Sequence, residues 1–445
     1  MDTPRTGQTE ENIQRGPGTT SNVRDAIGSH RSKPRHCMVV YARYPLGETR
    51  VQREAEALVA AGFEVDVICL REPGERPLER YRGVQIHRLP VRLEKRSLPR
   101  QLLSYVRFTL RAGARLTRLQ LRLPYTTVQV HNLPDFLVFS AVAPKIRGVP
   151  VILDLHDLMP EFFAGRFGSD ARRSIARLIR LQERLACRFA DHVITVSEHW
   201  RQTLIRRGVP EDGSSVVMNL ADEDLFSPSR SHRSPNGEFR LIYHGTVTRR
   251  YGLDLAVRAV ALVKDEIPEI RLTILGSGDQ MQELARLREQ LDLEGIVHLD
   301  DGFRLAEDLP PIIERADLGV VPYRNDVFTD GLLPTKLMEY AAMGIPCIAA
   351  RTTAIDEYFH DTMVEFFTPG DPEDLARRVR ELHGNRDRLA DLARRSRNFT
   401  RRHNWGDAGA SYVDTIRRLG ARDAPDRTAY AGRRPTSDET TSADR

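Results

Sequence analysis

The sequence predicts an α/β protein with two doubly wound domains. Two series of apolar strand segments and amphipathic helix segments follow one another along the chain. A segment rich in Pro, Ser and Arg, 227–237, separates the two series. Strands and helices that alternate at these lengths form parallel sheets with right-handed crossovers. Such sheets bind ligands at the carboxyl ends of their strands, so we expect two domains that face each other across a cleft.

The expected elements are read from short apolar runs, which predict strands, and from apolar residues spaced three or four apart, which predict helices. In the first series they are strand 37–42, helix 50–61, strand 64–70, and strands 127–130, 150–154 and 192–196. In the second series they are strand 239–243, helix 253–264, strand 270–275, helix 281–291, and strands 296–299 and 317–322.

The bulk composition indicates a globular protein of ordinary kind. The chain has 445 residues, of which 40% are hydrophobic and 29% charged, and its net charge of +5 is too small to indicate nucleic-acid binding. No apolar run approaches a membrane span, and no apolar signal region opens the chain, so we expect a cytoplasmic protein. Four scattered cysteines are expected to be buried thiols. The polar tails, 1–34 and 421–445, are expected to be disordered.

The segment 329–350, TDGLLPTKLMEYAAMGIPCIAA, carries the most information. Pro334 suits the start of a helix and Gly344 its end, and the apolar residues that follow suit a strand covered on both faces. A loop that enters a helix presents free N–H groups to a phosphate. Lys336 and Glu339 share one face of that helix, where a carboxylate could accept hydrogen bonds from a ribose. An ordinary αβ unit with a solvated Lys and Glu fits the same spacing.

The lysine in this segment is unusual for the chain. Only five of its 67 basic residues are lysines. A compact ammonium is chemically distinct from a guanidinium fork, so its retention at Lys336 hints at a specific role.

Two further loops of the second series are candidate phosphate contacts. Gly245, Thr246, Arg249 and Arg250 lie between an expected strand and the next helix, where loop amides and an arginine could hold a diphosphate. An exposed basic turn is the alternative. Gly276 and Gly278 also follow a strand and would allow a ligand to approach the backbone. The acidic pair at 300–301 is interpreted as a polar turn, and no metal site is expected.

The first series places histidines where strands end. His156 and Asp157 follow strand 150–154, and His131 and Asn132 follow strand 127–130. A histidine at this edge could exchange a proton with a substrate or donate a hydrogen bond to it. We expect function for His156, whereas His131 fits a structural role equally well.

Segment 91–123 is strongly basic. It contains nine Lys or Arg and one acid, with apolar residues interleaved. The pattern fits a basic amphipathic helix on an anionic membrane surface, and equally a helix that packs its apolar side on the sheet. Aromatic residues are scarce there, so we do not expect a nucleic-acid interface.

Taken together, these features resemble the retaining GT-B-fold glycosyltransferases of family 4, which use nucleotide-sugar donors. The resemblance covers about 37–419 and is most specific in GLLPTKLMEYAAMGIPCIAA, HGTVTRRYGLDLAVRAV, VHNLPDFLVF and LDLHDLMPEFF. It implies two Rossmann-like domains, with an acceptor site in 35–225 and a donor site in 226–400. It also implies a helix at 401–420 that crosses back to the first domain, and no need for a divalent metal or another cofactor.

On the donor side, the resemblance assigns Glu339 to the donor ribose. Gly331 stands where the family usually has a second glutamate that contacts the donor sugar, so we expect its neighbour Asp330 to replace that group. The loop that would line the donor continues through Leu332, Leu333 and Pro334.

The diphosphate contacts also depart from the family pattern. Thr246 and Tyr251 occupy the positions of the usual basic pair, so the role moves to Arg250 or Arg249, supported by Lys336. On the acceptor side, His156 matches the histidine beside the reacting sugar. Gly47 lies on the first loop, which in the family approaches the donor phosphate and the acceptor.

The function that follows is transfer of a hexose from a nucleotide diphosphate sugar to a hydroxyl, with retention of configuration. A surface polysaccharide or a glycolipid intermediate is the expected product, and the expected partners are the donor, a glycan or lipid-linked acceptor, and an anionic membrane surface at its inner face. The alternatives are a nucleotide-sugar 2-epimerase of similar fold and a non-enzymatic membrane-surface binder.

Overall fold

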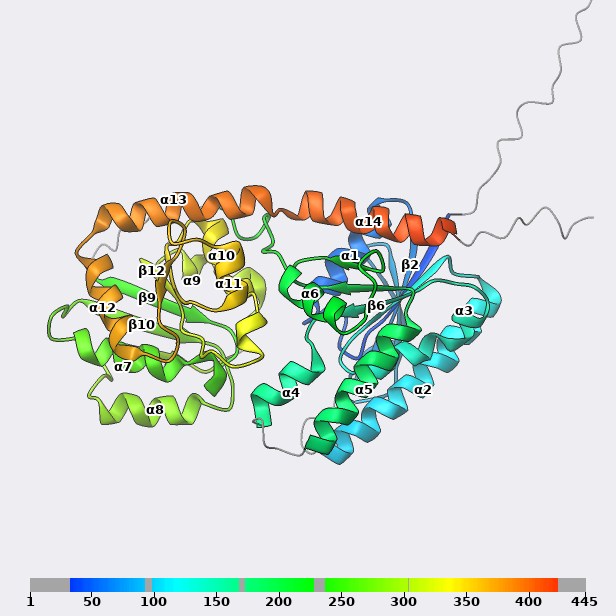
Figure 1. The fold of residues 1–445 in the computed structure, drawn as a ribbon, viewed down its shortest axis with the longest axis horizontal. Helices are drawn as coiled ribbons and strands as arrows, with labels where there is room; N and C mark the ends of the chain where they lie inside the picture. The colour runs from blue at the N-terminus through cyan, green and yellow to red at the C-terminus, as the bar shows by residue number, and fades with distance from the viewer. Residues whose placement is uncertain (1–32, 93–97, 168–172, 228–236, 303, 423–445) are drawn as a thin grey trace, which may run out of the picture. The chain divides into compact units, whose positions relative to one another are not determined.

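The structure is a computed structural model that describes residues 33–92, 98–167, 173–227, 237–302 and 304–422. Nearly all of the two expected tails lies outside these residues. Residues Pro34–Arg445 belong to one compact unit. Within it the chain forms two separate sheets, an eight-stranded sheet followed by a six-stranded one (Figure 1).

The first sheet is parallel except at one edge. Its strand order is β3-β4-β2-β1-β5-β6-β7-β8, and only β3 and β4 pair antiparallel. The strands are β1 (Arg35–Val39), β2 (Glu64–Leu70), β3 (Leu78–Tyr81), β4 (Val84–Leu89), β5 (Thr127–His131), β6 (Val151–Leu155), β7 (His192–Thr195) and β8 (Ser214–Val216). The helical segments of this half are α1 (Thr49–Ala60), α2 (Leu98–Arg122), η1 (Asp135–Ala141), α3 (Val142–Ile146), α4 (Met159–Phe167), α5 (Arg173–Phe189) and α6 (Glu198–Arg206).

The second sheet is parallel throughout, in the order β11-β10-β9-β12-β13-β14. Its strands are β9 (Phe239–His244), β10 (Ile270–Leu275), β11 (Val297–Asp300), β12 (Leu318–Val321), β13 (Cys347–Ala350) and β14 (Glu365–Phe367). The helical segments are η2 (Arg249–Tyr251), α7 (Leu253–Val263), α8 (Met281–Gln290), η3 (Ala306–Asp308), α9 (Pro310–Ile313), η4 (Thr329–Gly331), α10 (Thr335–Met343), α11 (Thr353–Tyr358), α12 (Pro372–His383) and α13 (Arg386–Arg402).

The predicted fold class is confirmed, since both sheets are doubly wound and predominantly parallel. The expected strands and helices are present, with ends that shift by at most three residues. Strands β3, β4, β8 and β14 were not predicted. Strand β3 is exposed and mostly charged or polar, so it shows no apolar run, and a turn at Arg82 and Gly83, both with positive φ, joins it to β4.

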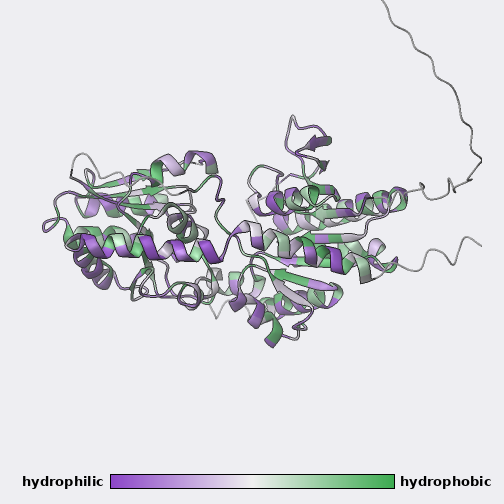
Figure 2. Ribbon diagram, turned by 90° about the horizontal axis from the view of Figure 1, so that it is seen from above, coloured by the Kyte–Doolittle hydropathy of each residue, from purple (hydrophilic) through white to green (hydrophobic). Residues whose placement is uncertain are grey.

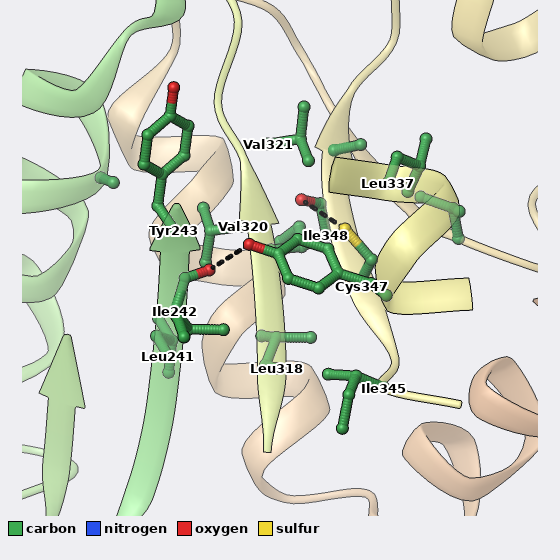
Figure 3. Packing of buried hydrophobic residues seen from close by; sticks show 14 of the residues in the cluster. Leu241, Ile242, Tyr243, Leu318, Val320, Val321, Leu337, Ile345, Cys347 and Ile348 are labelled. Carbon is green, nitrogen blue, oxygen red and sulfur yellow. Dashed lines mark hydrogen bonds between the residues drawn. The ribbon is translucent and has the colours of Figure 1, made fainter. Parts of the chain in front are cut away.

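Each sheet has its own hydrophobic core. Figure 2 shows hydrophobic residues concentrated in the strands, while the surrounding helices carry both hydrophilic and hydrophobic residues. In the second core, Leu337 of α10 is buried among residues of β9, β12 and β13 (Figure 3). The hydroxyl of Tyr340, also on α10, donates to the carbonyl oxygen of Ile242 at 3.2 Å. These contacts fix the helix that carries Lys336 and Glu339 against the sheet.

The last helix, α14 (Trp405–Arg422), packs on the first half of the chain (Figure 1). Tyr412, Val413, Ile416 and Leu419 are buried in the same hydrophobic cluster as residues of α1, β1 and β2. The helix therefore completes the first core from the far end of the sequence.

Candidate active site

The site in the second half is built around the start of α10. Pro334 precedes the helix in an extended conformation, and Gly344 ends it with a left-handed φ of 71°. Lys336 lies in the first turn and is buried, with 7% of its surface exposed. Its Nζ donates to the hydroxyl of Tyr323 at 2.8 Å. The ammonium is thus held at a fixed position at the edge of the sheet where the strands end.

Three tyrosine rings surround this ammonium. The Nζ of Lys336 lies 4.9, 5.3 and 5.2 Å from the ring centroids of Tyr243, Tyr251 and Tyr323. The rings of Tyr251 and Tyr323 are stacked, with centroids 4.5 Å apart. Aromatic faces attract a cation without neutralising it. We call Lys336 with these three residues the tyrosine cage.

Burial lowers the pKa of Lys336 to about 8, although the charge of Glu339 acts in the opposite direction. The ammonium therefore stays mostly protonated at neutral pH. It also lies beside the loop after β9, because a Cβ atom at Gly245 would stand 3.7 Å from Nζ. A phosphate at the backbone of this loop would meet a partly desolvated cation, whose attraction is stronger than in water.

The two glycines after β10 have a packing role in the structure. A Cβ at Gly276 would stand 1.9 Å from the carbonyl oxygen of Gly245, and one at Gly278 would stand 1.8 Å from that of Val247. Any other residue would push the two loops apart. The glycines therefore hold the β9 and β10 loops together, and their contact with a donor stays a prediction.

Glu339 carries a carboxyl group that is free to accept hydrogen bonds. Its Oε2 lies 3.2 Å from Nε2 of His244, yet neither atom has a hydrogen-bond partner among the described residues. Burial, reinforced by the charge of Lys336, lowers the pKa of His244 to about 3, so this ring is neutral. Burial also raises the pKa of Glu339 to about 7. Unpartnered buried polar atoms of this kind suit the hydroxyls of a ligand.

Of the two expected arginines, Arg250 is the better placed. Its guanidinium lies 5.1 Å from the ring of Phe162 and 4.9 Å from that of Phe328. Its Nη1 is buried without a partner among the described residues. Arg249 is exposed, as is Thr246. Two aromatic faces therefore hold Arg250, and its Nη1 is available to donate a hydrogen bond to a ligand.

The loop before α10 explains the glycine that departs from the family pattern. A Cβ at Gly331 would stand 2.4 Å from Cη2 of Trp200, which is buried on α6. A glutamate at this position would collide with the indole ring. Its neighbour Asp330 accepts hydrogen bonds from the backbone N–H and the hydroxyl of Thr353, both at 2.8 Å. Asp330 thus fixes the start of α11, and its role toward a donor sugar stays a prediction. Leu332 and Leu333 continue the loop, the second of them buried in the core.

We expect Gly331→Ala to lower the free energy of unfolding by about 1–3 kcal/mol, because the added methyl overpacks the Trp200 ring. Thermal unfolding would measure this against Gly295→Ala, since nothing lies within 4 Å of a Cβ at Gly295. A double-mutant cycle with Trp200→Leu should show coupling between the two positions. Equal melting temperatures for the two alanine variants would contradict the packing account.

In the first half, His156 follows β6 and is part of a buried polar network. Its Nε2 lies 3.5 Å from Oδ2 of Asp154 and 3.2 Å from Nδ1 of His131. Its backbone N–H donates to Oδ1 of Asn132 at 2.8 Å. Burial alone would lower the pKa of His156, but the charge of Asp154 and a hydrogen bond to it outweigh burial, so the pKa is raised. His156 is therefore biased toward its protonated form.

Asp154 is the centre of this network. Arg50 of α1 donates to both of its oxygens, at 2.9 and 3.1 Å, and the side chain of Gln129 donates to Oδ2 at 3.1 Å. Burial raises the pKa of Asp154, but the charges of Arg50 and His156 dominate and hold it well below its usual range. The carboxylate stays ionised beneath His156.

The other acceptor-side residues surround this centre. His131 is fully buried and lies 3.1 Å from Asp154. Burial lowers its pKa to about 4, so its ring is neutral and contacts Nε2 of His156. Asn132 donates to the carbonyl oxygen of Asp157 at 2.6 Å. Burial raises the pKa of the Asp157 carboxyl, against the charges of His156 and Arg250. Gly47 has a φ of 89°, with open space around it.

His131, Asp154 and His156 also bring ligand atoms within 4.8 Å of one another, as a metal site would. However, both oxygens of Asp154 already accept charged hydrogen bonds from Arg50. A cation there would have to displace that guanidinium. The donor set therefore suits a hydrogen-bond network better than a metal.

The network extends to the last helix. The hydroxyl of Tyr412 donates to Oε1 of Gln129 at 2.7 Å, and the amide of Gln129 donates to Glu54 at 2.8 Å and to Asp154. An unbroken set of hydrogen bonds thus joins α14 to the carboxylate below His156.

Several of these residues were missed in the sequence. His244 follows a strand just as His131 and His156 do, so the same rule could have found it. Arg50 and Tyr412 gave no local signal, because their partners lie far along the chain. The three tyrosines of the cage come from β9, from η2 and from the residues just after β12, which only the folded sheet brings together.

The basic segment 91–123 is only partly described, since residues 93–97 lie outside the described parts. In α2, Phe108, Ala112 and Leu116 are fully buried in the first core. On its outer side, apolar residues of the same helix are exposed: Leu102, Leu103, Val106, Leu110 and Leu121. The structure is therefore compatible with both interpretations of this segment, a helix on a membrane surface and a helix that packs its apolar side on the sheet. No described helix is long and apolar enough to cross a membrane.

Comparison with known proteins finds a glycosyltransferase family for each half of the chain. Residues 47–219 match the glycosyl transferase 4-like domain, and residues 238–385 match the glycosyl transferases group 1 family. The candidate colanic acid biosynthesis glycosyltransferase WcaL of Escherichia coli (strain K12) is 28% identical over 214 residues, which are 47% of this chain and 52% of WcaL. The match thus spans about half the length of that relative.

A longer match is the D-inositol 3-phosphate glycosyltransferase of Nocardioides sp., 27% identical over 82% of this chain and 84% of its own. Among solved structures, sucrose-phosphate synthase of Thermosynechococcus elongatus has a TM-score of 0.72 at 19% identity, covering 88% of this chain and 100% of that one. Its likeness confirms the two-domain fold. The chain belongs to the GT-B-fold glycosyltransferases of family 4.

Proposed function

We propose that the protein transfers a hexose from a nucleotide diphosphate sugar to an acceptor hydroxyl, with retention of configuration, in the synthesis of a surface polysaccharide or glycolipid. The observation that carries the proposal is the buried ammonium of Lys336 beside the Gly245 loop, one helical turn from the unpartnered carboxyl of Glu339. Family membership supports the reaction class.

In this proposal the second half holds the donor. The hydroxyls of the ribose bind Glu339, and the diphosphate lies against the Gly245 loop with Lys336 and Arg250 as its cations. As the bond between the anomeric carbon and the diphosphate oxygen breaks, negative charge grows on the leaving diphosphate. Fixed cations that are already desolvated stabilise that charge without having to reorganise.

The first half holds the acceptor near His156. A protonated imidazole donates a hydrogen bond to a sugar hydroxyl, and Asp154 keeps the ring protonated and oriented. The acceptor oxygen forms the new bond to the anomeric carbon, and its proton leaves with the diphosphate. Retention is supported by family membership. No residue is assigned to a divalent metal or another cofactor, in line with the family.

The first test is binding of the donor. We expect a thermal-shift panel of nucleoside diphosphates and their sugars to identify one that stabilises the protein. Glu339→Ala should abolish that shift, whereas replacing Glu283, an acid in the first turn of helix α8, by Ala should leave it unchanged. A shift that survives Glu339→Ala would refute the donor site. Formation of an epimerised sugar in the absence of an acceptor would show that the protein is an epimerase and not a transferase.

We also expect nucleotide affinity to depend on pH in the form of a bell. Glu339, whose pKa is raised to about 7, accepts ribose hydrogen bonds best when it is ionised, so affinity should rise as pH passes through about 7. Lys336, whose pKa is lowered to about 8, loses its charge above that pH, so affinity should then fall. Calorimetry across pH 5 to 10 would measure both limbs, and Glu339→Gln should remove only the acidic one. A flat profile would contradict both assignments.

We further propose that α2 contacts an anionic membrane surface from the inner side of the membrane. Its exposed leucines, Leu102, Leu103 and Leu110, would enter the lipid interface while its arginines meet the head groups. Vesicle flotation should recover the protein with anionic lipid but not with neutral lipid. Leu103→Gln should reduce recovery, whereas Leu262→Gln, an exposed leucine on α7, should not.

A further inference from the structure

A cavity of about 760 Å³ lies between α5 and the end of α6, and arginines dominate its lining. It is separate from the tyrosine cage and from the network below His156. Five arginines lie on its wall: Arg180, Arg184, Arg188, Arg206 and Arg207. We call this the arginine cavity.

Most of this positive charge is not balanced by acids. Arg207 binds Glu183 at 2.9 Å and also contacts Glu161. Arg180 attracts Glu183 without forming an ion pair, and the other three arginines form no ion pair with any residue that the structure describes. Like charges three or four residues apart on a helix repel one another, as Arg180, Arg184 and Arg188 on α5 do. An anion in the cavity would offset that repulsion and accept several charged hydrogen bonds.

A row of exposed apolar residues accompanies the arginines. Leu178, Leu181 and Leu185 of α5 are 64%, 50% and 48% exposed. Their spacing places them on one face of the helix, beside the face that carries Arg184 and Arg188. Helices α5 and α2 both pack on η1, so these leucines and those of α2 belong to the same part of the first half (Figure 1). Exposed apolar residues gathered in this way mark a contact surface.

The arginine cavity also leads toward the donor loop. A second hollow of about 440 Å³ shares Arg206 and Arg207 with it and is lined further by Trp200 and Asp330. Asp330 lies in the loop before α10, and Trp200 touches Gly331 of the same loop. A sugar attached to an anion in the arginine cavity could therefore extend toward the residues that would hold the donor.

We propose that the arginine cavity binds the diphosphate of a lipid-linked acceptor, whose hydrocarbon chain lies along the exposed leucines of α5. The inference deepens the proposed function by naming the acceptor class. A phosphate headgroup with no apolar chain would explain the arginines but not the leucines beside them. A purely apolar ligand would explain only the leucines.

The test uses farnesyl diphosphate as a soluble probe, with inorganic pyrophosphate and farnesol as its two halves. Calorimetry on the full chain should show that farnesyl diphosphate binds more tightly than pyrophosphate, and that farnesol does not bind. Arg184→Glu should weaken farnesyl diphosphate by about tenfold, the size expected for one charged hydrogen bond. Arg177→Glu is the matched control, because Arg177 is an exposed arginine of α5 outside the cavity wall.

Leucine variants separate the lipid from the phosphate. Leu181→Gln should weaken farnesyl diphosphate and leave pyrophosphate unchanged. If it changes neither, the cavity is a free-phosphate site and the lipid part of the proposal is wrong. Equal losses of farnesyl diphosphate affinity in Arg177→Glu and Arg184→Glu would show that general surface charge causes the binding. That result would overturn the proposed site. Arg184→Gln removes the charge without reversing it, and the melting temperature of each variant would show whether it is folded.

The same variants distinguish this proposal from the proposed function. Nucleotide binding should be unchanged in Arg184→Glu, because the donor residues lie on another domain. If farnesyl diphosphate is weakened by Lys336→Met and not by Arg184→Glu, it occupies the donor site and the arginine cavity is not its site. If no nucleotide binds but the Arg184 effect persists, the proposed function fails while the diphosphate site stands.

Discussion

Lys336→Met is expected to lower kcat/KM about 100- to 1,000-fold, the range found when one preorganised stabilising group is removed from a reacting charge. Methionine keeps much of the length of the lysine stem, so the tyrosine cage should stay filled. The loss would then report the ammonium itself. Steady-state kinetics with the donor identified by the thermal-shift panel would measure it.

The matched control for this variant is Lys264→Met. Lys264 caps α7 and donates to the carbonyl oxygen of Leu291 at 2.8 Å, away from the cage. Its replacement should leave kcat/KM near the parent value. Tyr323→Phe, which removes only the hydroxyl that accepts from Lys336, should cost much less than the loss of the charge. A Lys336→Met enzyme with parent kcat/KM would exclude this lysine as the cation for the leaving group.

Asp154→Asn is expected to have the largest effect on stability. Breaking a buried ion pair leaves the partner charge uncompensated, which costs about 3–5 kcal/mol. Here the stranded group is the guanidinium of Arg50, whose remaining ion pair among the described residues is with Glu54, at 3.2 Å. Chemical denaturation would measure the loss. Asp191→Asn, a partly exposed acid paired with Lys145, is the control and should cost far less.

The same substitution should also act on His156. The carboxylate of Asp154 raises the pKa of His156, so its removal should lower that pKa and shift the imidazole to its neutral form at lower pH. NMR titration of the labelled imidazole would follow this directly. A group whose folded pKa is raised stabilises the fold at low pH and loses that contribution as pH rises through its folded pKa. In Asp154→Asn this contribution of His156 should disappear, and an unchanged titration would show that Asp154 does not control the ring.

The sequence predicted the central strands and the helix that carries Lys336, because apolar runs and the Pro334 and Gly344 boundaries are local signals. It also placed His156 at the end of a strand. It could not find β3, because a charged edge strand has no apolar run.

The environment of the site residues was the part that sequence could not supply. Lys336 was expected to face a phosphate, but nothing in the sequence indicated that Tyr243, Tyr251 and Tyr323 would enclose its ammonium. Gly331 was recognised as a departure from the family, but its cause is the ring of Trp200, which lies more than a hundred residues earlier in the chain. Contacts between distant segments decide these features, and a single sequence does not record them.

The position of α14 has a practical consequence for dividing the protein. Its residues Tyr412, Val413, Ile416 and Leu419 complete the first core, so residues 35–225 alone are not an independent folding unit. Cutting the chain between its halves would expose this apolar surface and strip Gln129 of its tyrosine partner. Anyone who wishes to study the acceptor half by itself must graft residues 405–422 back onto it, because the autonomous piece is discontinuous in the gene.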